Sequence, residues 1–380
     1  MEKILLSPPH MSGAEQTYID KAFATNWIAP LGPNVDQFEQ DLAAYNNVEA
    51  VAATNTGTAA IHLALKLLNV QPGDTIFCST FTFIASINPA LYEKAVPVFI
   101  DAEKDTWGMS PEALQRALEE AAQKGKLPKA IIIVHIYGQS VKMDEIMALA
   151  NQYNIPVIED AAESLGSTYK GKKLGTFGEF GIYSFNGNKI ITTSGGGALV
   201  SNKKTPIHRA RFLSTQAREQ REYYQHVEAG YNYRLSNILA GIGIAQLQVL
   251  EDRIATKRAI FDCYQKGFQD IPNITMMPEL ADTKSNRWLT TVLIQDADPT
   301  EIMNKLSNKG IEARLLWKPL HCQPVFEDCQ FYEHIEGAGS VAEALFAQGL
   351  CLPSGTQMTE EQQNYVITIM REILAEVSCT

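Results

Sequence analysis

One lysine of this sequence stands in a polar, glycine-containing turn between two apolar segments. Lys189 ends the run Ser184–Lys189 (Ser-Phe-Asn-Gly-Asn-Lys), and the stretch Ile190–Ala198 that follows it contains three consecutive glycines. A lysine amine held in such a turn can form a Schiff base with a carbonyl cofactor. Most lysines in strand-connecting turns are solvated surface charges, so Lys189 alone leaves both interpretations open.

Two acids end a short apolar segment upstream of this lysine. Ile155–Ile158 leads directly into Glu159 and Asp160. An acid at the carboxyl end of a parallel strand faces the crevice in which α/β proteins bind ligands. Asp160 can there pair with the pyridine nitrogen of pyridoxal phosphate (PLP) and keep that cofactor an electron sink. The two acids can equally well cap a following helix.

A phosphate site is indicated further upstream. The polar loop Thr54–Ala60 contains one glycine and opens Ile61–Leu68, which has helical periodicity. Free backbone N–H groups and the helix dipole make such a terminus an anion site. Thr56 or Thr58 can add a hydroxyl, and Ser184 can supply another phosphate contact. An ordinary helix N-cap has the same appearance.

Length and charge limit the class of protein. A chain of 380 residues is expected to form one large and one smaller domain. The net charge of −11 argues against a nucleic-acid-binding protein. The segment Met1–Pro9 breaks too early for a signal peptide, and no apolar run approaches the roughly 20 residues that cross a bilayer. We therefore expect a cytoplasmic protein without a membrane segment.

Cysteine spacing gives no sign of a metal site or a disulfide framework. No CxxC pair occurs among the six cysteines, and we expect reduced, mostly structural thiols and no bound metal. The cysteines are Cys78, Cys263, Cys322, Cys329, Cys351 and Cys379.

Strand-like and helix-like segments alternate along the first half of the chain. Continuous apolar strands separated by helices predict a mainly parallel sheet covered on both faces. Asn237–Arg258 is expected to form one long helix leading out of a large domain, residues 1–255, toward a small C-terminal domain, residues 256–380. The expected strands are Thr75–Ser79, Ala95–Asp101, Ala130–His135, Pro156–Asp160, Gly181–Phe185 and Ala198–Ser201.

Over nearly its whole length the chain resembles the DegT/DnrJ/EryC1/StrS sugar aminotransferases, a branch of the fold-type I PLP enzymes. The resemblance rests on five motifs in order: Asn26–Gly32, Thr80–Ser86, Glu159–Glu163, Ser184–Lys189 and Gly230–Asn237. It implies an α/β fold with a large PLP-binding domain around a mainly parallel mixed sheet and a smaller C-terminal α+β domain. The opening Leu6–Met11 and the close Leu352–Thr356 are similar to those of the bacillosamine branch of this family.

The resemblance also implies the cofactor and its contacts. Asn232 resembles an asparagine that reaches the PLP phosphate of the neighbouring subunit, which implies a homodimer with a shared active site. The implied contacts are Lys189 for the Schiff base, Asp160 for the pyridine nitrogen, Phe83 for stacking on the ring, and Gly57, Thr58 and Ser184 for the phosphate.

Glu163 departs from the wider family, in which glutamine or histidine is more usual at this position. Members of the bacillosamine branch also carry glutamate here. Two anions should not meet unprotonated, so a direct contact between Glu163 and the phenolic oxygen of PLP is an open question.

Two segments, Asn26–Ala29 and Arg314–His321, are similar to those that line the sugar-nucleotide pocket in close relatives. Trp27 and Trp317 can pack on the sugar or uracil faces, or can equally serve interdomain packing. Arg314, Lys318 or His321 can meet the diphosphate. Arg234 fits either the phosphate site or a dimer contact. The implied substrate-binding residues are Asn26, Trp27, Ile28, Ala29, Asn188, Arg234, Arg314, Trp317, Lys318 and His321.

The resemblance implies a PLP-dependent aminotransferase in which Lys189 moves a proton as general base and acid. The expected reaction transfers an amino group from L-glutamate to C4 of a UDP-linked 2-acetamido-4-keto-6-deoxy hexose. Its product would be UDP-4-amino-4,6-dideoxy-N-acetylglucosamine for bacillosamine-type glycan synthesis. The alternatives are another keto-sugar nucleotide, aminated at C3 or linked to dTDP, and a non-catalytic regulator that senses PLP or a sugar. Lys189 opposes a further family variant, the dehydratases, in which histidine replaces the lysine.

Overall fold

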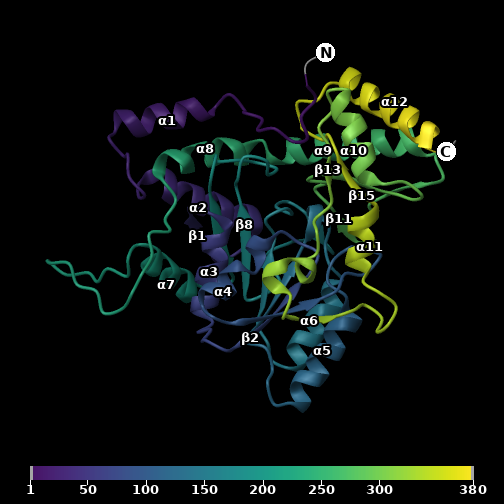
Figure 1. Ribbon diagram of the computed structural model, residues 1–380. Coiled ribbons are helices and arrows are strands. Elements are labelled where there is room, and N and C mark those ends of the chain that lie inside the picture. Colours follow the sequence, from purple (N-terminus) through teal and green to yellow (C-terminus); the bar gives the residue numbers. More distant parts are fainter. Residues whose placement is uncertain (1–2, 378–380) are drawn as a thin grey trace.

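An eight-stranded sheet forms the centre of the larger part of the chain in the computed structural model, which describes residues 3–377. The five strands from β3 to β8 in the order below pair in parallel, and β14 continues the parallel pairing beyond β3. Only β9 runs antiparallel to its two neighbours. The mixed, mainly parallel sheet predicted from the sequence is therefore confirmed (Figure 1). The order is β1 (Ala50–Thr54), β9 (Gly197–Ser201), β8 (Phe180–Ser184), β5 (Val157–Asp160), β4 (Ala130–Val134), β2 (Thr75–Ser79), β3 (Val96–Ile100) and β14 (Gln330–Tyr332).

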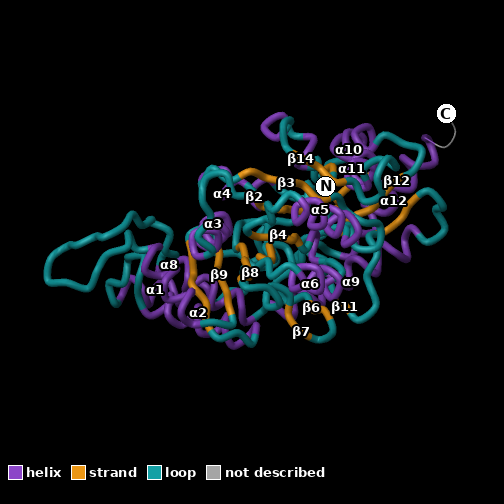
Figure 2. Tube along the Cα trace, turned by 90° about the horizontal axis from the view of Figure 1, so that it is seen from below, coloured by secondary structure: helices purple, strands orange, loops and turns teal. Residues whose placement is uncertain are grey.

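Helices cover both faces of this sheet, which explains why its central strands are apolar throughout. On β4, Ile131 and Ile133 pack in the core beneath α5 (Pro111–Gln123) and α6 (Met143–Gln152). Ile132 faces the opposite way, into the core formed with α3 (Gly57–Leu67), α4 (Asn88–Tyr92) and α7 (Lys204–Ser214). Figure 2 shows the strands lying between the two sets of helices. Side chains that alternate along a strand thus meet two separate cores.

Further helices lie at the β1 end of the sheet, where α2 (Pro33–Asn46) shares a core with β1, β9 and β8. Here α1 (Glu15–Ala24) and α2 pack against α8 (Asn237–Gln248). The single long helix expected over Asn237–Arg258 was wrong, because the chain leaves helical geometry at Val249, with φ −105° and ψ 7°. Val249 is β-branched and a weak helix former, and the break lets α9 (Leu250–Phe268) turn toward the C-terminal sheet.

The C-terminal part is built on a small antiparallel sheet. Its strand order is β10 (Ile274–Met276), β12 (Thr290–Ile294), β15 (Gly349–Leu352) and β13 (Arg314–Leu315). The helices α9, α10 (Pro299–Asn308) and α12 (Glu360–Val377) bury their apolar sides against it. The expected smaller C-terminal α+β unit is confirmed, while the boundary between residues 255 and 256 falls within α9 and stays a prediction. A third sheet joins β11 (Thr283–Lys284), β6 (Thr168–Tyr169) and β7 (Lys172–Lys173).

No helix within residues 3–377 combines the length and apolar character that a bilayer crossing requires. Cys379 lies outside these residues, and the other five cysteines are free thiols.

The segment that carries β14 returns from the C-terminal part to the large sheet, and one buried carboxylate holds it there. Asp101 follows β3 and has no exposed surface. Its oxygens accept hydrogen bonds from three backbone N–H groups and one hydroxyl of the returning chain, and from the neighbouring Ala102 N–H. The returning donors are the N–H groups of His334 (3.1 Å), Val341 (2.9 Å) and Ala342 (3.0 Å) and the Ser340 hydroxyl (3.0 Å). Ser340 is the N-cap of α11 (Val341–Gln348), which Val341 and Ala342 begin.

Replacing Asp101 with alanine is expected to lower the free energy of unfolding by about 3 kcal/mol, because several buried donors lose their acceptor together. Urea denaturation at neutral pH measures this loss. Asp328→Ala, at an exposed position, is the matched control and should change the free energy by less than about 0.5 kcal/mol. Equal effects of the two substitutions would show that Asp101 does not anchor this segment.

Candidate active site

A cavity of about 500 Å³ lies at the carboxyl ends of β5 and β8, between the large sheet and the C-terminal part. The start of α3 and the aromatic side chains of the C-terminal part complete its walls. Ten of the residues selected from the sequence line it together: Gly57, Thr58, Phe83, Asp160, Glu163, Ser184, Asn188, Lys189, Arg314 and Trp317.

The two acids at the end of β5 have different environments. Glu159 is fully buried beneath the sheet edge, where it accepts hydrogen bonds from the backbone N–H groups of Gly175 (2.8 Å) and Gly178 (2.7 Å). Asp160 faces the cavity, and its Oδ2 accepts a hydrogen bond from the Ser86 hydroxyl at 2.6 Å. Its Oδ1 accepts from the Ala162 N–H at 3.1 Å. Glu159 therefore stabilises a loop, whereas Asp160 presents a carboxylate of fixed orientation to a ligand.

The first turn of α3 has the properties of an anion site. Thr56 is its N-cap, and its hydroxyl oxygen accepts a hydrogen bond from the Ala59 N–H at 3.0 Å, which leaves the O–H of Thr56 able to donate. The N–H groups of Gly57 and Thr58 belong to the first turn and have no acceptor within the helix. A Cβ on Gly57 would approach the Ser184 Cβ to 3.2 Å, so glycine allows the helix start and β8 to lie this close. Thr56 and Thr58 both line the cavity, and each can offer a hydroxyl donor to an anionic ligand.

The amine of Lys189 is held between a carboxylate and an aromatic face. Its Nζ lies 3.5 Å from Oε1 of Glu163 and 4.1 Å from the centroid of the Trp288 ring. Glu163 is buried, and its other oxygen accepts a hydrogen bond from the Tyr137 N–H at 2.7 Å. Burial raises the pKa of Glu163, although the nearby Lys189 and the Tyr137 N–H act in the opposite direction. The net effect is a raised pKa, so Glu163 keeps its proton to a higher pH than an exposed glutamate does.

Aromatic rings form one wall of the cavity. The Phe83 and Trp317 rings lie 5.2 Å apart between centroids and are tilted by 42°. Phe83 is 51% exposed, so it is not an ordinary core phenylalanine. The Trp317 indole N–H is buried and has no acceptor among the described residues. The exposed Phe83 ring is thereby open to a ligand that brings a flat face, while the Trp317 N–H is a buried donor without an acceptor among residues 3–377.

Three residues that shape this site were missed from the sequence. Trp288 donates its indole N–H to the Asn188 carbonyl at 2.7 Å and stacks on Tyr137. Tyr137 is buried with φ +51°, a conformation that side-chain-bearing residues rarely adopt and that often marks functional sites. Ser86, which orients Asp160, belongs to the motif Thr80–Ser86, so a signal for it was present. Trp288 and Tyr137 carried no local signal.

The other residues selected from the sequence lie outside this cavity. The backbone of Asn26–Ala29, between α1 and α2, is held at the start of α8 by two hydrogen bonds. The side-chain amide of Asn237 donates to the Trp27 carbonyl, and its backbone N–H donates to the Ala29 carbonyl. The carbonyl of Asn232 accepts a hydrogen bond from the Asn55 amide, and Arg234 forms an ion pair with Glu39. Their assigned roles in binding a substrate or a cofactor stay predictions.

Lys318 and His321 also lie outside the cavity lining. His321 is bonded to the Thr80 hydroxyl at 2.6 Å and to Glu343 at 3.1 Å, and its ring stacks on Phe331. Together with the Cys322 thiol, His321 and Glu343 place three possible metal ligand atoms within 4.8 Å of one another. Both ring nitrogens of His321 already have hydrogen-bond partners. The expectation of no bound metal is not tested by this structure and stays a prediction.

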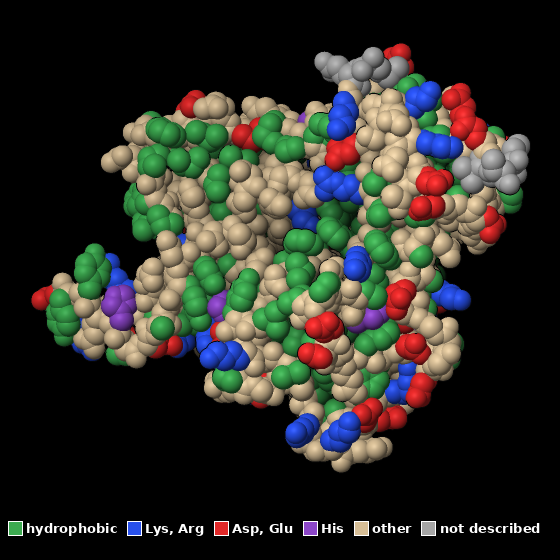
Figure 3. All heavy atoms as spheres, in the orientation of Figure 1, with side chains coloured by type: hydrophobic (Ala, Val, Ile, Leu, Met, Phe, Trp, Pro, Cys, Tyr) green, Lys and Arg blue, Asp and Glu red, His purple; other side chains and the backbone are tan. Residues whose placement is uncertain are grey.

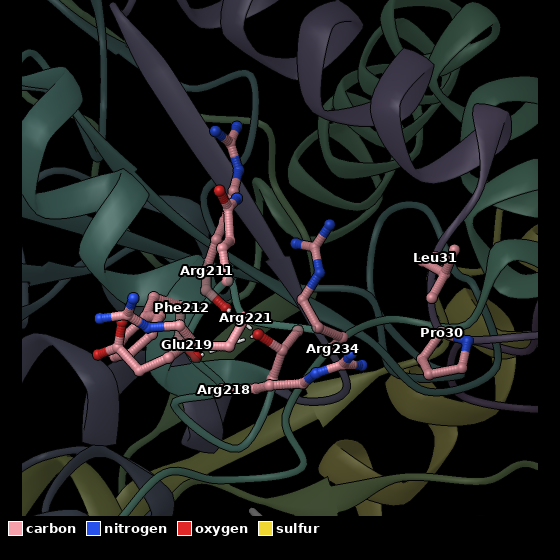
Figure 4. A pocket seen from close by; sticks show the side chains of 10 residues that line it. Pro30, Leu31, Arg211, Phe212, Arg218, Glu219, Arg221 and Arg234 are labelled. Carbon is pink, nitrogen blue, oxygen red and sulfur yellow. Dashed lines mark hydrogen bonds between the residues drawn. The ribbon is translucent and has the colours of Figure 1, made fainter. Parts of the chain in front are cut away.

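A second, more open cavity of about 670 Å³ lies beside the segment 216–230, which protrudes from the molecule at the left of Figure 1. Figure 4 shows its arginines, which come from α7, from the protruding segment and from the motif Gly230–Asn237. Pro30 and Leu31 of the motif Asn26–Gly32 form its other side (Figure 4). The arginines are Arg211, Arg218, Arg221 and Arg234.

Comparison with known proteins agrees with this geometry. The model of the DegT/DnrJ/EryC1/StrS aminotransferase family matches residues 9–371. The chain belongs to this family. It is a PLP-dependent aminotransferase that acts on a sugar nucleotide.

Three curated relatives and one solved structure show how far the similarity extends. The chain is 60% identical over 377 residues to EpsN of Bacillus subtilis, whose name describes a candidate pyridoxal phosphate-dependent aminotransferase; the match covers 99% of this chain and 97% of that protein. It is 35% identical to GDP-perosamine synthase of Escherichia coli O157:H7, covering 99% and 100%. It is 31% identical to the UDP-4-amino-4,6-dideoxy-N-acetyl-beta-L-altrosamine transaminase of Campylobacter jejuni 81-176, covering 91% of each.

The aminotransferase TlmJ from Streptoalloteichus hindustanus superposes with a TM-score of 0.90 at 26% identity, covering 99% of this chain and 100% of that one. These comparisons confirm the fold-type I architecture, the cofactor and the general reaction. None of the three relatives bears the name of the bacillosamine branch expected from Leu6–Met11 and Leu352–Thr356, so the specific sugar stays a proposal.

Glu163→Gln is expected to raise the thermal midpoint of the cofactor-free protein at neutral pH. Because burial raises the pKa of Glu163 in the folded protein above 4.5, its ionisation costs stability as the pH rises through the folded pKa. The variant lacks this cost, so its advantage should shrink as the pH falls toward 4.5. Differential scanning fluorimetry against pH measures the effect, with the exposed Glu222→Gln as control. An advantage that does not depend on pH would contradict this account.

Proposed function

We propose that this enzyme transfers the amino group of L-glutamate to C4 of a UDP-linked 2-acetamido-4-keto-6-deoxy hexose, giving UDP-4-amino-4,6-dideoxy-N-acetylglucosamine for bacillosamine-type glycan synthesis. The observation that carries the proposal of catalysis is the presence of Lys189, Asp160 and the start of α3 in one cavity. These groups supply an amine, a carboxylate and an anion site, which is the donor set that PLP requires.

The cavity suggests how PLP would be held. The phosphate would bind at the N–H groups of Gly57 and Thr58 and at the Ser184 hydroxyl. Asp160, oriented by Ser86, would pair with the pyridine nitrogen and keep it protonated. PLP, when bound, supplies an electron sink for the charge left when a proton departs from the donor's α-carbon.

Lys189 performs the proton transfers in this proposal. Its amine would first hold the cofactor covalently, then be released by the donor and accept the α-proton. Glu163, at 3.5 Å, and the Trp288 ring, at 4.1 Å, would stabilise the ammonium that results and keep its Nζ in place between the two steps. Returning that proton to a carbon atom completes each half of the reaction, first with glutamate and then with the keto sugar.

The acceptor is proposed from the site and from the relatives' names together. Trp317 offers a ring face and a free indole N–H, and Arg314 lines the same cavity with a side chain that is 62% exposed. These groups suit a sugar attached to a diphosphate. The Campylobacter relative is named for a UDP-linked 4-amino-4,6-dideoxy sugar with an N-acetyl group, which favours C4 and UDP. The perosamine synthase makes a GDP-linked sugar the second candidate.

We further propose that two copies of the chain form the active enzyme. Large hydrophobic side chains are exposed over α1, the segment that follows it and the protruding segment, and Figure 3 shows hydrophobic side chains gathered there. A second copy covering this face would place Asn232 and the arginines of the second cavity near its partner's Lys189. The exposed side chains are Phe23, Trp27, Ile28, Leu31, Tyr223, Tyr224 and Val227.

The acceptor is tested by incubating PLP-loaded protein and L-glutamate with either the UDP-linked 4-keto sugar or a GDP-linked 4-keto-6-deoxy hexose. Mass spectrometry and NMR should show a C4 amine with gluco configuration only with the UDP sugar. Amination of the GDP sugar alone would overturn the proposed acceptor. Conversion of PLP by glutamate without either amino sugar would redirect the search to C3-keto or dTDP-linked sugars, and failure of that first half-reaction would favour the regulator.

The shared site is tested by complementation between two damaged subunits. Lys189→Ala should abolish turnover, and Asn232→Ala should weaken PLP binding about tenfold through loss of a phosphate contact. A heterodimer of the two variants, purified through two different tags and assayed at limiting PLP, should recover activity because one of its sites is intact. Activity no higher than that of the parents would contradict a site shared across the dimer.

A further inference from the structure

A buried lysine that the proposed reaction does not use is linked to Lys189 through Trp288, which contacts both of them. Lys257, in α9, is 2% exposed. Its Nζ donates to the Trp288 carbonyl at 2.8 Å and to the Ser7 hydroxyl at 3.0 Å. These are its only hydrogen-bond partners among residues 3–377, and neither is a carboxylate. Taking an amine out of water without a counter-ion is costly, so the position calls for an explanation beyond packing.

Both partners of Lys257 meet again at one atom of the Lys189 turn. The Trp288 indole N–H donates to the Asn188 carbonyl at 2.7 Å, and the Ser7 hydroxyl lies 3.5 Å from the same oxygen. The next residue is Lys189, whose amine rests on the Trp288 ring. The Lys257 amine of α9 thus contacts the N-terminal segment and the segment before β12, and both of these segments contact Asn188, the residue beside the reacting lysine.

Trp288 is fixed at each of its polar atoms. Its N–H donates to the Asn286 side chain at 2.9 Å, its indole N–H to Asn188, and its carbonyl accepts from Lys257. Asn286 is itself bonded to the carbonyl of Glu163, the carboxylate beside Lys189. Loss of the Lys257 contact would therefore release the backbone carbonyl of the residue whose ring supports the reacting amine.

We propose that Lys257 is a positioning residue for Lys189, acting through Trp288 and Ser7, which converge on the carbonyl of Asn188. The inference rests on the role proposed above for Lys189. A displacement of the reacting amine by about 1 Å would lower kcat by up to about a hundredfold while leaving substrate binding largely intact.

The protonation state of Lys257 makes the proposal testable. Burial lowers the pKa of Lys257 from 10.5 to about 7. A neutral amine has two N–H groups for its two acceptors, whereas the ammonium has a third N–H with no partner. Charged groups on the surrounding segments are engaged elsewhere. The ion pairs are Arg258 and Arg287 with Glu279, Arg314 with Glu312, and Lys189 with Glu163. The hydrogen-bonded pairs are Arg253 with His10 and Glu15 with Gln246.

The test compares Lys257→Met with Lys266→Met, an exposed lysine of the same helix. In the PLP-loaded full chain, Lys257→Met should lose between about tenfold and about a hundredfold in kcat with little change in KM. Wild type and Lys266→Met should also lose activity, and shift the absorbance of the Schiff-base band, as the pH falls through about 7, whereas Lys257→Met should show neither change. Wild-type kcat and pH dependence in Lys257→Met would overturn the proposal.

Stability of the cofactor-free protein gives a readout that does not depend on activity. The pKa of Lys257 is 10.5 in the unfolded chain and about 7 in the folded protein, so only the folded protein releases this proton between about pH 7 and pH 10.5. The thermal midpoint should therefore rise with pH across this range. Lys257→Met should lack this gain. If that variant does not fold, Ser7→Ala decides, since a kcat loss in the same direction supports the proposal and unchanged kcat overturns it. Absence of a Schiff-base band in wild type would instead refute the role of Lys189.

Discussion

The placement of one ammonium group between a carboxylate and an indole face is the constraint on which the rest of the site depends. Glu163 follows β5 of the large sheet and Trp288 precedes β12 of the C-terminal sheet, so the two groups that hold Lys189 belong to different parts of the fold. Each part alone supplies only one of the two groups that contact the amine. The position of the reacting amine is therefore defined only when the two parts are packed together.

The topology of the large sheet explains why the other groups gather at the same place. Parallel strands present their carboxyl ends at one edge, where Asp160 ends β5, Ser184 ends β8 and the loop after β1 opens α3. The antiparallel β9 then returns the chain along β8 and leaves the Lys189 turn at this edge. Anion site, carboxylate and lysine follow from strand order, whereas the C-terminal part supplies Trp317 of the aromatic wall, opposite Phe83 of the large part.

The sequence predicted the residues that belong to local patterns. Asp160 and Ser184 follow apolar strands, Gly57 opens a periodic helix, and Lys189 lies in a polar turn, so each could be placed from its immediate neighbours. Family resemblance then indicated that they share one site. The structure also separated Glu159 from Asp160, which no local pattern could do, because only the register of β5 decides which acid faces the cavity.

Residues whose role arises from contacts distant in sequence could not be predicted. Trp288 lies about a hundred positions from its Asn188 partner, and Lys257 has an ordinary place in a helix until its surroundings are known. The break at Val249 likewise depends on which cores α8 and α9 enter, which overrides the continuous helical pattern of the sequence. Local propensity is a weak guide wherever tertiary packing decides.

The most direct test of the central claim is to locate the covalent attachment of PLP. Holoenzyme reduced with borohydride and digested with a protease should yield, by mass spectrometry, a single pyridoxyl-modified peptide that contains Lys189 and its turn. Modification of another lysine, Lys257 included, or PLP bound without any reducible linkage, would contradict the account of the site given by the Lys189–Glu163–Trp288 arrangement.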